Sequence, residues 1–252
     1  MILAPNKRCI MIKIVFMKIK WISNFMFLFI LFCLSQDILA QTAVNQLDKD
    51  GKRDGPWEKF YDNNRVRYRG TFKHGKEVGT FKYFSAENSD FPVIVKVYND
   101  KNNIAEVKYY TTQGVLESEG QMDGKNRVGK WIFYHIDGKT VMSEENYVDG
   151  KLHGPYKTFY NDGTPTEIAS YKNGLLDGNY KKYAIRGHLI NDFNYIGGKL
   201  NGMATYYSLK SGELIKKGPF KDDQRVGTWE NYVDGELVST EQPAIKPEKT
   251  KK

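Results

Sequence analysis

The feature that most constrains the fold is an internal repeat of about 24 residues. Glycines recur along the chain with spacings of 24, 50, 25, 24, 24 and 25 residues. These anchor glycines are Gly55, Gly79, Gly129, Gly154, Gly178, Gly202 and Gly227. The interval of 50 residues holds one more copy, in which Ala105 takes the anchor position, because "AEVKYYTTQG" aligns with "GPYKTFYNDG" without gaps. The chain therefore contains eight copies.

Aromatic residues occupy fixed positions relative to the anchor, although they make up only 14% of the chain. The +2 column holds Trp57, Phe81, Val107, Trp131, Tyr156, Tyr180, Ala204 and Trp229. The +5 column, aromatic in every copy, holds Phe60, Phe84, Tyr110, Tyr134, Phe159, Tyr183, Tyr207 and Tyr232. The −7 column holds Phe72, Tyr98, Met122, Tyr147, Tyr171, Tyr195 and Phe220. Ala105 in place of the anchor glycine, and Ala204 in the +2 column, mark weaker copies.

Each copy is predicted to form a β-hairpin. In the copy anchored at Gly154, "GPYKTFY" and "TPTEIASY" are the expected strands and "NDG" is the turn between them. A second turn of the type "KNGLLDG" leads to the next copy, so we expect the anchor glycines in turns, where glycine supplies a positive φ.

A single hairpin is marginally stable in water, so neighbouring copies must stack to bury the aromatic columns. We therefore predict an all-β fold over residues 51–240, in which about eight hairpins form an elongated, twisted antiparallel meander after an N-terminal signal helix. The +2 and +5 columns are three residues apart, which places them on opposite faces of a regular strand. Either both faces are partly apolar or a bulge changes the alternation.

The N-terminal segment is typical of a secretory signal peptide. Lys18 and Lys20 precede an apolar run over residues 25–34, and Ala40 lies at a plausible cleavage point before Gln41. That run is about ten residues, whereas a membrane-spanning helix needs about 20. We predict a signal peptide over residues 1–40, with an uncleaved anchor as the alternative, and translation starting at Met11 or Met17. Residues 41–50 are assigned to a linker and residues 241–252 to a disordered basic tail.

Removal of residues 1–40 changes the chemistry that is available to the chain. The net charge falls from +8 to +4, and the tail contributes most of the remainder, so the repeats are nearly neutral and do not favour nucleic acid as a ligand. Both cysteines, Cys9 and Cys33, lie in the removed segment. A disulfide, a thiol nucleophile and a cysteine metal ligand are then excluded.

The repeat resembles the variant form of the MORN repeat, on the strength of "GKLHGPYKTFYNDG" and "GKNRVGKWIFYHIDGK". The resemblance covers about residues 51–240 and implies an antiparallel β meander that serves in binding and scaffolding. Some bacterial relatives are labelled antitoxins, which implies a cytoplasmic protein partner. The export signal of this chain departs from that picture.

No motif predicts catalysis or a cofactor. The four histidines (His74, His135, His153 and His188) fall in different columns, so we predict no metal site. The stretch "DKDGKRDG" begins like a calcium loop with Asp48 and Asp50, but Lys52 occupies the place of the next oxygen ligand. The second-strand acids Glu117, Glu119, Glu144 and Glu145 are interpreted as solvated charges rather than a glycosidase pair.

Lysines also form columns, which stacking would turn into stripes. The +3 lysines are Lys82, Lys108, Lys157 and Lys181, and the −3 lysines are Lys52, Lys76, Lys151 and Lys199. Such stripes are either a surface for an anionic ligand or a solvated face that prevents edge-to-edge aggregation. We expect the second, because acidic residues are interleaved with the lysines.

Taken together, these patterns predict an exported, non-catalytic binding or scaffold protein of the cell envelope. Its expected partner is a protein, with an envelope lipid or polysaccharide as alternatives and no cofactor. An antitoxin-like inhibitor of a partner protein is the alternative function.

The +5 column can be tested by substitution. Phe159→Ala should reduce the free energy of unfolding by about 2–4 kcal/mol, because it removes a packed ring. Lys157→Ala, which lies between the two aromatic columns, should cost less than about 0.5 kcal/mol. Denaturation midpoints of the two variants measure the difference, and equal midpoints would show that the column assignment is wrong.

Overall fold

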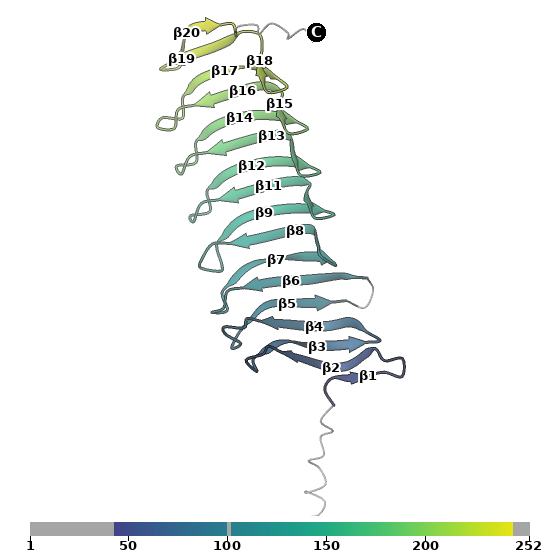
Figure 1. Ribbon diagram of the computed structural model, residues 1–252. Coiled ribbons are helices and arrows are strands. Elements are labelled where there is room, and N and C mark those ends of the chain that lie inside the picture. Colours follow the sequence, from purple (N-terminus) through teal and green to yellow (C-terminus); the bar gives the residue numbers. More distant parts are fainter. Residues whose placement is uncertain (1–42, 100–101, 244–252) are drawn as a thin grey trace, which may run out of the picture. The chain divides into compact units, whose positions relative to one another are not determined.

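A computed structural model of the chain describes residues 43–99 and 102–243 (Figure 1). The predicted signal peptide, its helix and residues 244–252 of the predicted tail lie outside the described residues. The described residues belong to one compact unit, which begins at Val44, apart from Ala43. They contain no helix, and therefore none with the length and hydropathy needed to cross a membrane.

Each of the eight copies forms one hairpin, with a first strand that contains or follows the anchor and a second strand after the turn. The first strands are β2 (Arg53–Phe60), β4 (Lys76–Phe84), β6 (Ile104–Tyr110), β8 (Asn126–Tyr134), β10 (Lys151–Leu152) with β11 (Gly154–Phe159), β13 (Leu175–Tyr183), β15 (Lys199–Leu200) with β16 (Gly202–Tyr207), and β18 (Gln224–Arg225) with β19 (Trp229–Val233). The second strands are β3 (Val66–Lys73), β5 (Pro92–Tyr98), β7 (Leu116–Asp123), β9 (Val141–Val148), β12 (Pro165–Lys172), β14 (Leu189–Ile196), β17 (Leu214–Lys221) and β20 (Glu236–Glu241).

The strands pair in chain order and always antiparallel, so the sheet is an open meander (Figure 1). This confirms the predicted all-β meander of stacked hairpins. A further short strand, β1 (Gln46–Leu47), pairs with β2 and lies within the segment that was assigned to a linker.

The turns within the hairpins explain the variation in repeat length. Four of the eight are five-residue loops in which the first N–H donates to the fifth carbonyl, as from Tyr160 to Thr164 at 2.8 Å. Two copies with a spacing of 25 residues have six-residue loops instead, closed by His135 N–H to Thr140 O and by Ser208 N–H to Glu213 O. The additional residue is therefore accommodated at the sheet edge, which leaves the stacking of strands unchanged.

The anchor glycines do not lie in turns, so the prediction that placed them there is wrong. All seven have a positive φ between 56° and 109°, and all but Gly227 lie within or at the start of a first strand. Each anchor after Gly55 marks a bulge against the preceding second strand: Arg69 pairs with Lys82 and Thr71 with Val78, so two additional residues lie in β4. Glycine is required because the bulge needs a left-handed residue.

The copy without an anchor glycine confirms this reason. Ala105 is absent from the residues with positive φ, and the register between β5 and β6 is unbroken from Ile94–Tyr109 to Tyr98–Ala105. At the anchor position, a residue with a Cβ atom is thus found only in the copy whose first strand has no bulge.

The core is made where a +2 side chain packs on the preceding second strand. Phe81, Trp131 and Trp229 are each 0% exposed. Beneath them lie Gly70, Gly120 and Gly218, and a Cβ atom added to these glycines would lie 2.5, 2.4 and 2.2 Å from the ring above. Smaller +2 residues lie beside larger partners: Val107 pairs with Lys96, and Ala204 lies in one core cluster with Phe193. Ring volume and partner volume therefore compensate along the stack.

The remaining predicted core residues are less buried. In the +5 column Phe84 is 5% exposed, whereas Phe60 is 47% exposed because no complete hairpin precedes it in the sheet. The other aromatic residues of the two predicted columns are half-buried. Ala105 and Ala204, which mark the copies predicted to be weaker, are only 2% and 1% exposed.

The +2 and +5 columns lie on opposite faces of the sheet. The guanidinium of Arg69 lies 5.3 Å from the ring centroid of Phe84, and Arg69 is the cross-strand partner of Lys82 at +3. Phe81 at +2 instead contacts the rings of Phe72 and Tyr98. Every hairpin also has a bulge between +4 and +5, but its additional residue lies in the second strand. Both faces are therefore partly apolar.

A double-mutant cycle tests the packing of rings on glycines. Gly120→Ala should lower the free energy of unfolding by about 1–3 kcal/mol, because the new methyl group overlaps the Trp131 ring. In a Trp131→Val background, which copies the smaller residue at Val107, Gly120→Ala should be nearly neutral. Denaturant unfolding of the four proteins measures the coupling, and equal effects of Gly120→Ala in both backgrounds would contradict the packing.

Candidate binding surface

Aromatic side chains of the +2, +4 and −7 columns lie on one face of the sheet, where their ring contacts form separate runs. Ring centroids lie 5.1 Å apart for Phe72–Phe81 and 5.9 Å apart for Phe81–Tyr98, both edge to face. A second run connects Tyr180, Phe193, Tyr206 and Trp229, with centroids 5.0 to 6.3 Å apart. Because the sheet is a single layer, these rings cover one another only in part, and the face remains open to a partner.

Arginines stack on the tryptophans of this face. Arg53, Arg127 and Arg225 lie two residues before an anchor, and their guanidinium carbons are 5.4, 4.7 and 4.0 Å from the rings of the tryptophans in their own copies. Where the +2 residue is tyrosine or alanine, the same position holds Leu152, Leu176 or Leu200. The spacing Arg-x₃-Trp, which recurs in three copies of the sequence, could have identified these arginines.

Tyrosine hydroxyls on this face donate to glutamates. Tyr83 and Tyr98 share the carboxylate of Glu77, and Tyr180 donates to Glu167 at 3.1 Å. Burial and then the neighbouring carboxylate raise the pKa of all three tyrosines. The hydroxyls therefore stay protonated at neutral pH and act as donors.

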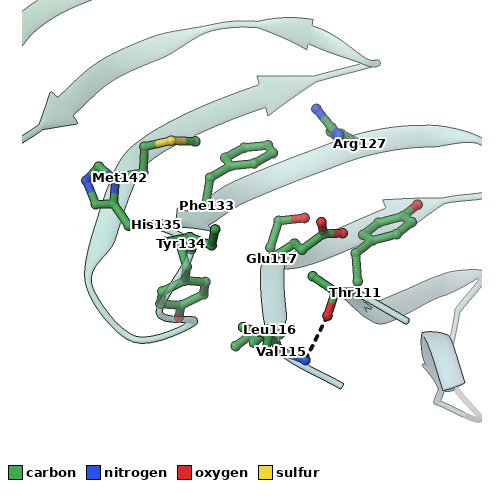
Figure 2. A pocket seen from close by; sticks show the side chains of 12 residues that line it. Thr111, Val115, Leu116, Glu117, Arg127, Phe133, Tyr134, His135 and Met142 are labelled. Carbon is green, nitrogen blue, oxygen red and sulfur yellow. Dashed lines mark hydrogen bonds between the residues drawn. The ribbon is translucent and has the colours of Figure 1, made fainter. Parts of the chain in front are cut away.

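A depression of about 480 Å³ opens on the aromatic face near the loop between β8 and β9 (Figure 2). The rings of Tyr109 and Phe133 line it, together with Glu117, Met142 and Ile136. Ile136 is 98% exposed and Met142 is 41% exposed. Glu117 and Met142 are the additional residues of two second-strand bulges, which direct their side chains toward this space.

Ile136 has counterparts in other loops. Ile185 and Leu209 occupy the same position, seven residues after an anchor, and are 65% and 66% exposed. Of these three aliphatic residues, Ile136 alone lines the depression described above.

The opposite, charged face carries the +3 and +5 columns. Lys108 pairs with Glu119 at 2.8 Å and Lys181 pairs with Asp192, so two of the four +3 lysines are neutralised across strands. Tyr134 at +5 donates to Glu119 at 2.6 Å. Lys108 and then Tyr134 lower the pKa of Glu119, whereas burial and Glu119 raise the pKa of Tyr134 to about 12. The −3 lysines make no ion pair with any of the described residues.

Three of the histidines have structural contacts. Ring nitrogens of His135 and His188 lie 3.2 and 2.8 Å from the carbonyl oxygens of Phe159 and Leu209, each in the next copy. Tyr61 and Tyr160 connect successive copies in the same way, through the carbonyls of Phe84 and Tyr183. These contacts join neighbouring hairpins, and the separate columns of the histidines gave no sign of them.

His74 contacts the acidic segment "DKDGKRDG", which begins like a calcium loop. Its Nδ1 lies 2.8 Å from Asp48 Oδ2, and its backbone N–H donates to Asp54. The other oxygen of Asp48 accepts from the N–H groups of Asp50 and Lys52. His74 is the main cause of the lowered pKa of Asp48. The Asp48 oxygens are thus already used within the chain, and Asp50 contributes a backbone N–H.

The comparison with family models adds to this geometry. The model of the MORN repeat variant matches residues 53–74 and 152–173. Both matches begin two residues before an anchor glycine and span one hairpin, β2–β3 and β11–β12. Two of the eight hairpins thus match the MORN repeat variant, which supports a MORN-repeat family for the chain. The other six hairpins have the same arrangement in the sheet.

MORN repeats are generally binding or scaffold modules. Comparison of the chain with curated proteins gives no match.

The ion pair between Lys108 and Glu119 on the charged face can be tested by varying the pH. The folded-state pKa of Glu119 is lowered, so its pairing with Lys108 stabilises the protein above the usual carboxyl pKa and is lost as the pH falls through the lowered value. Lys108→Met should therefore destabilise by about 0.2–1 kcal/mol at neutral pH, since the pair is partly exposed, and by less at acid pH.

Lys82→Met is the matched control, because Lys82 lies in the same column opposite Arg69. Its effect on the denaturation midpoint should not depend on pH in this way. The same pH dependence for both variants would contradict the assigned pair.

Proposed function

We propose that this MORN-repeat protein is an exported binding or scaffold protein of the cell envelope, with no catalytic activity of its own. Its partner is a protein that docks on the aromatic face at the depression beside Ile136. The signal-like pattern of residues 17–41, which lie outside the described residues, supports export.

The proposed binding site rests on the depression in the aromatic face. It combines exposed apolar side chains (Ile136 and Met142) with the aromatic walls of Tyr109 and Phe133 and with two charged groups, Glu117 and Arg127. An apolar centre with a polar rim is typical of a surface that receives a side chain of a partner protein. A lipid or polysaccharide ligand has less support, because Lys108 and Lys181 are already paired with acids.

We propose that the protein has no catalytic activity because the repeats leave few described residues outside the hairpins. The hairpins extend from Arg53 to Glu241, so the repeats occupy almost all of the described residues. The carboxylates that could have served a glycosidase, Glu119 and Glu144, instead form cross-strand ion pairs with Lys108 and Lys130.

The experiment is cell fractionation followed by N-terminal sequencing of the native protein and affinity capture from the fraction that contains it. A chain that starts at Gln41 in the periplasm, envelope or medium is the expected result. Capture of a partner should weaken about tenfold or more with Ile136→Ser, because an exposed apolar anchor is removed. Ile185→Ser, at the same loop position of another copy, is the matched control and should leave capture unchanged.

Two results would overturn the proposal. A full-length chain in the cytoplasm would exclude export and would favour the antitoxin-like alternative, with the search moving to products of neighbouring genes. Equal capture by both isoleucine variants would show that the depression is not the docking site.

A further inference from the structure

Three side chains that can ligate a metal ion converge beside the first hairpin. A ring nitrogen of His74 and one carboxylate oxygen each from Asp48 and Asp54 all lie within 4.8 Å of one another. No other group of three such atoms converges among residues 43–99 and 102–243. The columns of the histidines did not predict this group, because only one histidine takes part and Asp48 precedes the first hairpin.

Three separate segments supply these side chains. Asp48 directly follows β1, Asp54 is the second residue of β2, and His74 lies in the two-residue turn between β3 and β4. An ion held by all three would connect the edge strand β1 to both ends of the first hairpin. β1 has only two residues, both exposed, so such a connection strengthens a short pairing.

Hydrogen bonds behind the ligands orient them toward a common point. Asp48 Oδ1 accepts from the N–H groups of Asp50 and Lys52, both at 2.9 Å, and Asp54 Oδ1 accepts from the backbone N–H of His74 at 3.0 Å. The side chain of Asp48 is only 8% exposed, and its Oδ2 faces the imidazole. Carboxylates that ligate a metal are commonly held in this way by further hydrogen bonds.

The backbone at His74 does not itself require a histidine. The equivalent turn residues, five before an anchor, also have a positive φ and are Gly124, Asp149, Asn173, Gly197 and Asp222. Glycine, asparagine and aspartate are the residues that adopt this conformation most readily. Asp177, the counterpart of Asp54, accepts from the N–H of Gly197 at 3.0 Å without any imidazole nearby in that turn. The imidazole of His74 is therefore available for another role.

The donor atoms favour a transition-metal ion over calcium. Two carboxylates and a neutral imidazole, with its proton on Nε2, match the charge and the N and O ligands of Zn²⁺, whereas Ca²⁺ takes about six to eight oxygens. Nδ1 of His74 lies 2.8 Å from Asp48 Oδ2. Ligand atoms of tetrahedral Zn²⁺, with bonds of about 2.1 Å, are about 3.4 Å apart, so the ring must move by about 0.6 Å. The His74 side chain is 65% exposed and has room for this shift.

We propose that Asp48, Asp54 and His74 bind one divalent transition-metal ion of the Zn²⁺ type, which fastens β1 and the turn between β3 and β4 to β2. The three protein ligands leave the remaining position to water. Because the ligands come together only in the folded chain, binding stabilises the folded protein. This inference does not depend on the proposed export or on a partner at Ile136.

The test is a calorimetric titration of the metal-free, untagged full chain with Zn²⁺, together with its denaturation midpoint at each Zn²⁺ concentration. The expected result is a Zn²⁺ site that raises the midpoint, with weaker binding of Ca²⁺. His74→Asn should weaken this binding about 100-fold or more, since loss of an outer contact alone costs about 10–100-fold. Asn173 occupies the equivalent turn with φ 52°, so the variant should fold normally and its midpoint should not respond to Zn²⁺.

His188→Asn is the matched control, because the His188 ring contacts the carbonyl of Leu209 and no carboxylate. It should bind Zn²⁺ as the unmodified chain does. Cys9 and Cys33 are the same in all three proteins, so the difference between variants reports the proposed site. Equal Zn²⁺ binding by the unmodified chain and His74→Asn would overturn the proposal and leave His74 with only its hydrogen bond to Asp48. Tighter binding of Ca²⁺ than of Zn²⁺ would also overturn it.

Discussion

The contact between a +2 side chain and the second strand of the preceding hairpin is the interaction on which the rest of the structure depends. A single-layer sheet has no opposing layer, so its apolar side chains are buried mainly by neighbours along the sheet. Trp131 and Trp229 become fully buried because Gly120 and Gly218 let the rings lie directly on the backbone. Each hairpin therefore depends on the hairpin before it, which is the nearest-neighbour stability expected of repeat proteins.

The anchor glycines make this contact possible. Their positive φ allows two additional residues in the first strand, and the bulge they form precedes the +2 side chain. The Ala105 copy shows the other solution, in which β5 and β6 pair without a bulge and a small Val107 lies beside Lys96. Both solutions can bury the +2 residue almost completely, as Trp131 and Val107 show.

The candidate recognition surface depends on a different set of bulges, those in the second strands. The second-strand bulges carry Glu117 and Met142 to the depression, and the six-residue loop between β8 and β9 carries Ile136 to its rim. The two ends of the described sheet differ. Asn45 and β1 cap the first hairpin, whereas in the last hairpin Arg225 stacks on the tryptophan and donates to Glu241.

The amino-acid sequence by itself determined the repeat, the eight hairpins and their antiparallel order, because glycine turns and aromatic spacing act within about 24 residues of chain. It also placed the family motif in the correct register, as the matches at residues 53–74 and 152–173 confirm. It placed the anchor glycines in turns, and it did not identify Gly120, Arg127 or Ile136 as residues of interest. Only the tertiary structure decided these points, because a bulge, a stacked ring and a depression depend on which residues of neighbouring strands come opposite each other. That register is set by pairing between copies, and no single copy contains it.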